Sequence, residues 1–273
     1  MQPGFSSNVH PLIQRAITEK DMQAPNFSLN GKIALLTGAS RGIGEAIAQA
    51  FALQGAHCIL TSRRIEGLKE AAARIAALGC SVEIRACHSG NLQEIDDLVE
   101  DIGKRFGRID ILVNNAATNP YAGPFLGATE AAWDKTFDVN VKGVFFLTQK
   151  VVPFMPRGGS IINIASIEGE RPGLDRAIYS MTKAAVISMT KAFSKELASR
   201  GIRANAVLPG LVATQMSRSL MQDSAAYQDA VQLIPLRRPA QPEEISGTAL
   251  YLASSASSFT TGAMIVVDGG VLA

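Results

Sequence analysis

Three glycines lie close together in one short segment, Thr37-Gly38-Ala39-Ser40-Arg41-Gly42-Ile43-Gly44, which joins a run of apolar residues to a helical pattern. Glycine at the first position permits a tight turn, at the second lets the backbone approach a phosphate, and at the third allows a helix to pack closely on a strand. The N–H groups and the positive dipole end of that helix then face the phosphates. The segment belongs to the first strand–helix–strand unit, where it predicts a dinucleotide-binding turn.

Short β-branched runs alternate with longer helical patterns from residue 32 onward. This alternation predicts a parallel sheet with helices on both faces. Since no Pro/Gly-rich linker divides the chain, we expect a single doubly wound Rossmann domain of the α/β class over residues 29–273, with a seven-stranded parallel sheet. The expected strands are 33–37, 57–61, 82–86, 111–114, 160–165, 203–208 and 264–268. The expected helices are 43–54, 65–78, 91–106, 129–155, 178–200 and 242–254.

Two segments depart from this rhythm. Residues 1–28 are rich in Gly, Pro, Ser and Asn, and we expect them to form a mobile N-terminal extension or, alternatively, an arm that packs on a partner subunit. Residues 212–235 carry Met216 and Met221 among several serines. Because Met-bearing loops adapt to ligands, we expect two short helices there that form a lid over a pocket; an ordinary surface insertion is the alternative.

The composition argues for a globular protein of the cytoplasm. Hydrophobic residues make up 47% of the 273, and 26 Lys plus Arg stand against 24 Asp plus Glu, for a net charge of +2. Because the basic residues are interspersed with acids, neither nucleic acid nor a membrane surface is an expected partner. The longest charge-free stretch, 111–129, is broken by Asn, Pro and Gly and does not suit a membrane span. The three cysteines and three histidines are scattered, so no metal site is expected.

The choice between the two nicotinamide dinucleotides depends on the end of the second strand. Folds that bind NAD place an acid there to hold the ribose 2′-hydroxyl. This chain has Ser62 and Arg63 instead, and Arg41 lies within the glycine turn. Two guanidinium groups can bind a 2′-phosphate through charge-assisted hydrogen bonds, and Ser62 can donate another. The sequence therefore predicts NADP(H) in preference to NAD(H).

Four polar residues follow the glycine turn. Tyr179 and Lys183 are four residues apart in a helical pattern and project from the same face. Ser166 follows the fifth predicted strand, and Asn140 lies in the predicted helix 129–155. Together with the Gly-x-x-x-Gly-x-Gly spacing, this Asn–Ser–Tyr–Lys set resembles the short-chain dehydrogenase/reductase family, and the resemblance covers about residues 30–270.

Carbonyl reduction needs a proton donor and a stabiliser of negative charge on oxygen. Tyr179 is expected to protonate the alkoxide in reduction and to deprotonate the alcohol in oxidation. A free tyrosine has a pKa of about 10, and we expect the Lys183 ammonium and the positive nicotinamide to lower the pKa of Tyr179. Ser166 is expected to hydrogen-bond the carbonyl oxygen. The resemblance implies that Lys183 also binds the nicotinamide ribose and that Asn140 holds a water linking Lys183 to solvent.

The other cofactor contacts come mainly from the resemblance. Asn115 and Ala116 belong to an element similar to the family's Asn-Asn-Ala-Gly, although a purely structural role for the asparagines is equally open. His88 stands where the family usually has an Asp beside the adenine, as in NADP-dependent carbonyl reductases of the dehydrogenase/reductase member 4 type; an ordinary structural histidine is the alternative. The expected cofactor-binding residues are Gly38, Ser40, Arg41, Gly42, Ile43, Gly44, Ser62, Arg63, His88, Asn115, Ala116, Tyr179, Lys183, Pro209, Gly210, Val212 and Thr214.

The substrate pocket is expected to be lined by Tyr121, Ile167, Glu168 and Leu211. Their largely apolar character favours a medium-sized ketone, aldehyde or quinone, whereas Glu168 can recognise a hydroxyl or amine, or simply face water. The predicted function is thus an NADP(H)-dependent oxidoreductase that interconverts a carbonyl compound and its alcohol. The physiological substrate and the preferred direction stay open.

Three alternatives remain at this stage. One is a 3-oxoacyl-carrier-protein reductase, but a position where that branch of the family has a docking Arg is Phe146 here, with Lys195 left to supply a second charge. The others are an NAD-dependent alcohol dehydrogenase of the same family and a non-catalytic NADP-binding regulator, which would be expected to lack one of the four polar residues. The resemblance also implies a homotetramer that associates through the central helices, with residues 261–270 as the last strand and a subunit contact.

Overall fold

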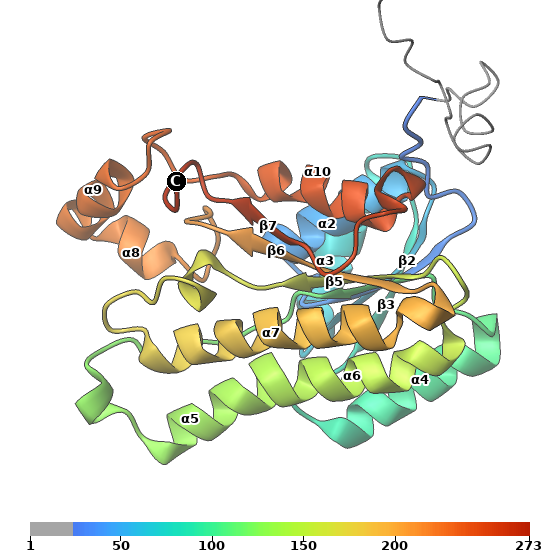
Figure 1. The fold of residues 1–273 in the computed structure, drawn as a ribbon, viewed down its shortest axis with the longest axis horizontal. Helices are drawn as coiled ribbons and strands as arrows, with labels where there is room; N and C mark the ends of the chain where they lie inside the picture. Colours follow the sequence, from blue (N-terminus) through green and yellow to red (C-terminus); the bar gives the residue numbers. More distant parts are fainter. Residues whose placement is uncertain (1–23) are drawn as a thin grey trace, which may run out of the picture.

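A seven-stranded parallel sheet forms the centre of the molecule, with the strand order β3-β2-β1-β4-β5-β6-β7 (Figure 1). The computed structural model describes residues 24–273, so most of the predicted extension 1–28 lies outside the described residues. The seven predicted strands are confirmed to within one residue at each end. They are β1 (Ile33–Thr37), β2 (His57–Ser62), β3 (Val82–Ala86), β4 (Ile111–Asn114), β5 (Ser160–Ile164), β6 (Arg203–Pro209) and β7 (Met264–Val267).

The strand order reverses beside β1, because the chain runs outward through β2 and β3 and then returns to place β4 on the other side. In an open α/β sheet, ligands bind outside the carboxyl ends of the strands at such a reversal. Thr37 ends β1 and Asn114 ends β4, so the glycine turn and the Asn-Asn element meet at this point.

Helices cover both faces of the sheet (Figure 1). One face carries α2 (Gly42–Leu53), α3 (Ile65–Ala76) and α10 (Pro242–Ala253). The other carries α4 (Leu92–Phe106), α6 (Gly143–Val151) and α7 (Ala177–Glu196). Successive residues of β1 enter opposite cores: Leu36 packs under α2 and α10, whereas Leu35 packs under α4 and α6. This is why the strands are nearly continuous apolar runs in the sequence.

The predicted helix 129–155 is wrong as a single element. It is divided into α5 (Glu130–Phe137), a π-helical turn η3 (Asp138–Lys142), α6 and a 3₁₀ turn η4 (Val152–Phe154). Within η3 the side chain of Asn140 binds both backbone groups of Thr118, with its Oδ1 2.8 Å from the Thr118 nitrogen and its Nδ2 2.9 Å from the Thr118 oxygen. Such π turns frequently mark functional sites. The predicted helix 178–200 likewise ends at Glu196 and continues as a separate 3₁₀ turn η6 (Ala198–Arg200).

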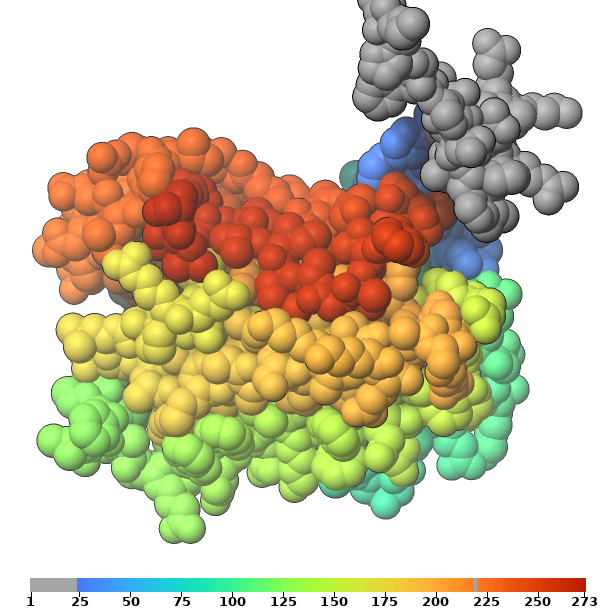
Figure 2. Space-filling view, viewed as in Figure 1, coloured from blue at the N-terminus to red at the C-terminus, as the bar shows by residue number. Residues whose placement is uncertain are grey.

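The segment 212–235 forms two short helices, α8 (Arg218–Gln222) and α9 (Ser224–Gln232), as predicted. They make a lobe at one end of the molecule, with the last residues of the chain against it (Figures 1 and 2). Leu236 N–H donates to the Gly269 oxygen at 3.2 Å, which fastens the end of this segment to the C-terminal residues. Across residues 24–273, no helix is both long enough and apolar enough to cross a membrane.

Candidate active site

The glycine turn between β1 and α2 has the geometry that its sequence predicts. Gly38 and Gly42 have φ angles of +64° and +58°, in the left-handed region that favours glycine. A Cβ atom at Gly38 would lie 2.8 Å from the Ala116 Cα, and one at Gly42 would lie 3.3 Å from the Thr214 Cγ2. The glycine turn therefore lies against the segment after β4 and the loop after β6, and side chains at these glycines would collide with them. The three segments meet where the strand order reverses, which is the place of the ligand-binding crevice in open α/β sheets.

Hydrogen bonds from Asn115 fasten the end of β4 to the glycine turn. Its Nδ2 donates to the backbone oxygens of Thr37 at 2.9 Å and Gly38 at 3.0 Å. The hydroxyl oxygen of Thr37 accepts the N–H groups of Asn115 and Ala116, both at 3.0 Å. Asn115 therefore bridges the end of β4 and the end of β1. Thr37 was not predicted as a site residue, although a hydroxyl residue at the end of the first apolar run, next to the glycine turn, could have indicated this role.

Asn114 has a structural role. Its Nδ2 donates to Asn163 Oδ1 at 2.8 Å and to Thr148 Oγ1 at 3.1 Å, and Asn163 in turn donates to Thr190 Oγ1 at 2.8 Å. This buried chain of polar side chains joins β4 and β5 to α6 and α7. It fixes the position of α7, which carries Tyr179 and Lys183.

Tyr179, Lys183 and Ser166 come together at the carboxyl end of β5. Tyr179 and Lys183 are both buried, and the Lys183 Nζ lies 5.5 Å from the centroid of the Tyr179 ring. The Lys183 ammonium donates to the backbone oxygen of Ile164 at 2.8 Å. The Ser166 Oγ accepts the N–H of Glu168 at 3.1 Å, and Ser166 also hydrogen-bonds the Tyr179 hydroxyl.

Asn140 joins this group indirectly. Besides its two bonds to Thr118, its Nδ2 donates to Thr182 Oγ1 at 3.1 Å, next to Lys183 on α7. The side-chain amide is thus occupied by protein partners, and the predicted water remains a prediction. Asn140 holds the segment after β4 against α7.

Burial has the largest effect on the pKa values of Tyr179 and Lys183. It raises the pKa of Tyr179 well above the usual range; the charge of Glu168 adds to this rise, while Arg176 and the bond from Ser166 oppose it. Burial also lowers the pKa of Lys183 to about 8, against an opposing effect of Glu168. In the chain by itself the pKa of Tyr179 is therefore raised, because the loss of solvation of the buried phenolate outweighs the stabilisation from its neighbours. The expected lowering by Lys183 together with the positive nicotinamide stays a prediction for the complex with cofactor.

The predicted cofactor residues all lie at the carboxyl edge of the sheet. The first of them follow β1 (Gly38, Ser40, Arg41) or begin α2 (Gly42, Ile43, Gly44). Others end or follow β2 (Ser62, Arg63), follow β3 (His88) or follow β4 (Asn115, Ala116). The rest lie on α7 beside the end of β5 (Tyr179, Lys183) or end and follow β6 (Pro209, Gly210, Val212, Thr214). A glycine-lined turn at a helix N-terminus is suited to a dinucleotide pyrophosphate. The residues present at this edge therefore fit a dinucleotide.

The two arginines proposed for the 2′-phosphate are both exposed, on either side of the β1–β2 edge. The Arg41 guanidinium donates to the side-chain oxygen of Gln215, a contact between the glycine turn and the loop after β6 that sequence reasoning missed. The Ser62 hydroxyl donates to the Arg64 oxygen at 2.9 Å. The His88 Nδ1 accepts the Gly90 N–H at 3.0 Å, so the proton of the neutral ring is on Nε2.

The loop after β6 is held by a residue that was not predicted. The Ser217 hydroxyl donates to the Val212 oxygen at 2.6 Å and accepts the Thr214 N–H at 3.1 Å. Because Ser217 is far from the glycine turn in the sequence, the sequence pattern did not reveal this role. Ser217 therefore shapes the backbone that presents Val212 and Thr214 to the crevice.

Two of the four predicted substrate residues lie directly beside Ser166. Ile167 and Glu168 form the 3₁₀ turn η5 (Ile167–Gly169) directly after Ser166, and Leu211 follows β6, partly exposed. Tyr121 lies in the loop after β4, but its hydroxyl donates to the Pro124 oxygen at 2.7 Å. That bond closes the loop on itself and leaves mainly the ring of Tyr121 for contact with a substrate.

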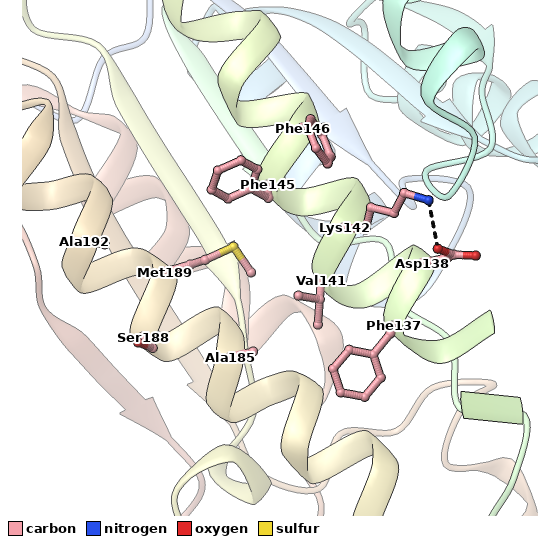
Figure 3. Close-up of a pocket in the computed structure, with 10 residues that line it drawn as sticks. All are labelled: Phe137, Asp138, Val141, Lys142, Phe145, Phe146, Ala185, Ser188, Met189 and Ala192. Atoms are coloured by element: carbon pink, nitrogen blue, oxygen red, sulfur yellow. Dashed lines mark hydrogen bonds and ion pairs between the residues drawn. The ribbon is translucent and has the colours of Figure 1, made fainter. Parts of the chain in front are cut away.

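An apolar hollow of the described surface lies away from these residues. Figure 3 shows it as a groove between the α5–α6 region and α7, with an ion pair between Lys142 and Asp138 at 3.2 Å along one side. Its lining is mostly apolar: Phe137, Asp138, Val141, Lys142, Phe145, Phe146, Ala185, Ser188, Met189 and Ala192. It contains none of the four catalytic candidates. Within residues 24–273, no group of three or more His, Cys, Asp or Glu side chains is placed to hold a metal ion.

Comparison with known proteins shows the family of the chain. A family model described as enoyl-(acyl carrier protein) reductase matches residues 38–272. The chain belongs to the short-chain dehydrogenase/reductase family and is an oxidoreductase of that family.

Individual relatives share most of their length with this chain. Dehydrogenase/reductase SDR family member 4 of Oryctolagus cuniculus is 39% identical over 244 residues, 89% of this chain and 94% of the relative. The 3-oxoacyl-(acyl-carrier-protein) reductase FabG of Thermotoga maritima is 40% identical over 246 residues, 89% of this chain and 99% of the relative. Among solved structures, a gluconate 5-dehydrogenase from Burkholderia cenocepacia in complex with NADP and tartrate has a TM-score of 0.86 and 33% identity, covering 91% of this chain and 98% of that one. NADP is therefore bound within the family.

Proposed function

We propose that the protein is an NADP(H)-dependent reductase that interconverts a ketone, aldehyde or quinone and the corresponding alcohol. The observation that carries the proposal is the group formed by half-buried Ser166 and buried Tyr179 and Lys183, at the same carboxyl edge of the sheet as the glycine turn. Bound NADPH supplies the hydride. The chain itself has to provide a proton and a stabiliser for the carbonyl oxygen.

Tyr179 is the proton donor. Because burial raises the pKa of Tyr179, its phenol keeps its proton at neutral pH and is ready to act as a general acid. The Ser166 Oγ accepts the Glu168 N–H, and its O–H bonds the Tyr179 hydroxyl in the chain by itself. When a carbonyl compound is bound, this O–H turns to the substrate oxygen and donates to it as charge develops there. Lys183, with a pKa of about 8, is largely protonated at neutral pH and stabilises the phenolate that remains after proton transfer.

The preference for NADP(H) over NAD(H) rests on Arg41 and Arg63 beside the crevice and on the absence of an acid at the end of β2. Solved relatives with bound NADP support it. Arg63→Asp should weaken NADPH binding far more than NADH binding, measured by fluorescence titration of the reduced nicotinamide, while Lys69→Asp on the exposed face of α3 should affect neither. Equal loss for both cofactors in Arg63→Asp would refute the contact with the 2′-phosphate.

A 3-oxoacyl-carrier-protein reductase is the second candidate, favoured by the 40% identity to FabG of Thermotoga maritima. Against it, the position of the basic docking residue is Phe146, which lines the apolar groove of Figure 3. The exposed Lys195 is left to supply the second docking charge. Turnover of a 3-oxoacyl group should therefore be no faster on an acyl-carrier protein than on a simple thioester. A strong preference for the carrier would replace the first candidate by the second.

Association into a homotetramer is part of the proposal. A closed tetramer with two-fold symmetry needs two different self-complementary faces. The groove between α6 and α7, with Phe145 41% exposed, supports one. The edge strand β7, with Val266 exposed and Phe259 fully exposed nearby, supports the other. We also assign the protein to the cytoplasm, since its three cysteines are all free thiols.

The test of the proposed function is NADPH consumption measured across a panel of ketones, aldehydes and quinones. Oxidation of NADPH that depends on a carbonyl compound is the expected result. A protein that binds NADPH in a titration but oxidises it with none of the panel would instead be a non-catalytic regulator.

A further inference from the structure

Glu168 is an acidic side chain of the catalytic group whose carboxylate the mechanism above does not use. It lies in η5, two residues after Ser166, and its backbone N–H holds the Ser166 Oγ at 3.1 Å. Its Oε2 accepts a hydrogen bond from the Ser180 hydroxyl at 3.4 Å, and Ser180 directly follows Tyr179 on α7. The carboxylate is therefore anchored between the elements that carry the two catalytic hydroxyl groups.

The protein leaves most of the hydrogen-bonding capacity of this carboxylate unused. A carboxylate has about four acceptor sites. Within residues 24–273, its only polar side-chain contacts are the long bond from Ser180 and the Arg176 Nη1, which lies 3.8 Å from Oε1, beyond hydrogen-bond length. Only 23% of the Glu168 side chain is exposed, so solvent does not fully replace the missing donors. The burial raises the pKa of Glu168, as expected for an incompletely solvated carboxylate.

The charges around Glu168 decide which kind of donor it suits. Its charge acts on Tyr179 and Lys183 as well as on Arg176, and its partner Ser180 directly follows Tyr179, so the carboxylate belongs to the same group of interacting side chains. Arg176 and protonated Lys183 bring two positive charges against the single negative charge of Glu168. A cationic amine would meet net repulsion here, whereas a neutral hydroxyl group can use the free acceptor sites without that cost.

We propose that Glu168 determines substrate specificity by accepting a hydrogen bond from a hydroxyl group adjacent to the substrate carbonyl, which makes α-hydroxy ketones the preferred substrates. The inference rests on the proposed reductase function for its chemistry, but the contact itself is a matter of binding. A site built to bind a hydroxyl discriminates strongly against the analogue that lacks it.

The experiment compares two ketones of nearly equal size, phenacyl alcohol and propiophenone, which differ by a hydroxyl in place of a methyl group. The ratio of their kcat/KM values is measured with NADPH for the wild type, for Glu168→Gln and for Glu170→Gln, an exposed carboxylate two residues away. Affinities for the NADPH-loaded protein are measured in parallel by isothermal titration calorimetry, so that the contact is tested whether or not turnover occurs.

The wild type should prefer phenacyl alcohol at least tenfold, equivalent to about 1.4 kcal/mol, and Glu168→Gln should remove most of that preference while Glu170→Gln keeps it. A merely structural role for Glu168 would lower both kcat/KM values equally and leave the ratio unchanged, which would overturn the inference. Equal affinities of the wild-type protein for the two ketones would also overturn it, independently of how any variant folds. Preferential binding of phenacyl alcohol without NADPH oxidation would leave the contact standing and refute the reductase function instead.

Discussion

Replacing Lys183 by methionine should make the folded protein more stable while destroying its activity. Burial lowers the pKa of Lys183 to about 8 in the folded protein, against about 10.4 in the unfolded chain. That gap corresponds to about 3 kcal/mol of lost stability at pH 7. Methionine removes this cost but leaves the Ile164 oxygen without its donor, which costs about 1 kcal/mol. The net expectation is a gain of about 2 kcal/mol in the free energy of unfolding at pH 7.

The gain should shrink as the pH rises. Between about pH 8 and pH 10.4 the unfolded chain binds more protons at this lysine than the folded protein does, so the wild type recovers stability across that window. At pH 9 the advantage of Lys183→Met should have fallen to about 1 kcal/mol. Burial raises the pKa of Cys58 and of Cys87 to about 12, and the loss of stability this causes above about pH 9 is common to both proteins and cancels in the difference.

The assay is urea denaturation of the wild type, Lys183→Met and Lys191→Met at pH 7 and pH 9. Lys191 is an exposed lysine on the same helix, so its replacement should change little at either pH. A Lys183→Met protein that is less stable than the wild type at pH 7, or a difference that does not depend on pH, would refute the reasoning that this ammonium is held at a cost to stability.

Two further changes test the scaffold. In a urea titration, Thr37→Val should lower the free energy of unfolding by about 2 kcal/mol or more, because two backbone N–H groups lose their acceptor. Thr61→Val on β2 removes only one donated hydrogen bond and should lower it by about half as much. Phe145→Asp should reduce the mass measured by light scattering from that of a tetramer to that of a smaller species. The control Leu78→Asp, just after α3, should leave the mass unchanged. An unchanged mass for Phe145→Asp would exclude the groove as a subunit interface.

The sheet could be predicted closely from the sequence because its signal is local. Ile33–Thr37 and Ile111–Asn114 are apolar runs bounded by turn residues, and strands buried on both faces need no more information than that. The glycine turn is equally local, since the φ values of Gly38 and Gly42 follow from the residue type itself.

The features that sequence reasoning missed depend on contacts between distant segments. Nothing in the pattern of residues 129–155 marks the π turn, because Asn140 is diverted by the backbone of Thr118, 22 residues away. The contact of Arg41 with Gln215 is likewise invisible, as it joins residues 174 apart. The rise in the pKa of Tyr179 in the chain by itself was also not predicted, because the extent of burial is a property of the folded protein, whereas the spacing of Tyr179 and Lys183 reveals only that they share a helix face.

The role of Tyr179 as the proton donor is tested most directly by kcat/KM for carbonyl reduction in Tyr179→Phe, compared with Tyr251→Phe, whose hydroxyl bonds Thr260 away from the crevice. General acid catalysis by a positioned side chain contributes about a hundredfold or more, so Tyr179→Phe should lose at least that much while still binding NADPH, and Tyr251→Phe should stay near the wild type. A Tyr179→Phe protein that reduces the same carbonyl compound at the wild-type rate would contradict the role assigned to this phenol.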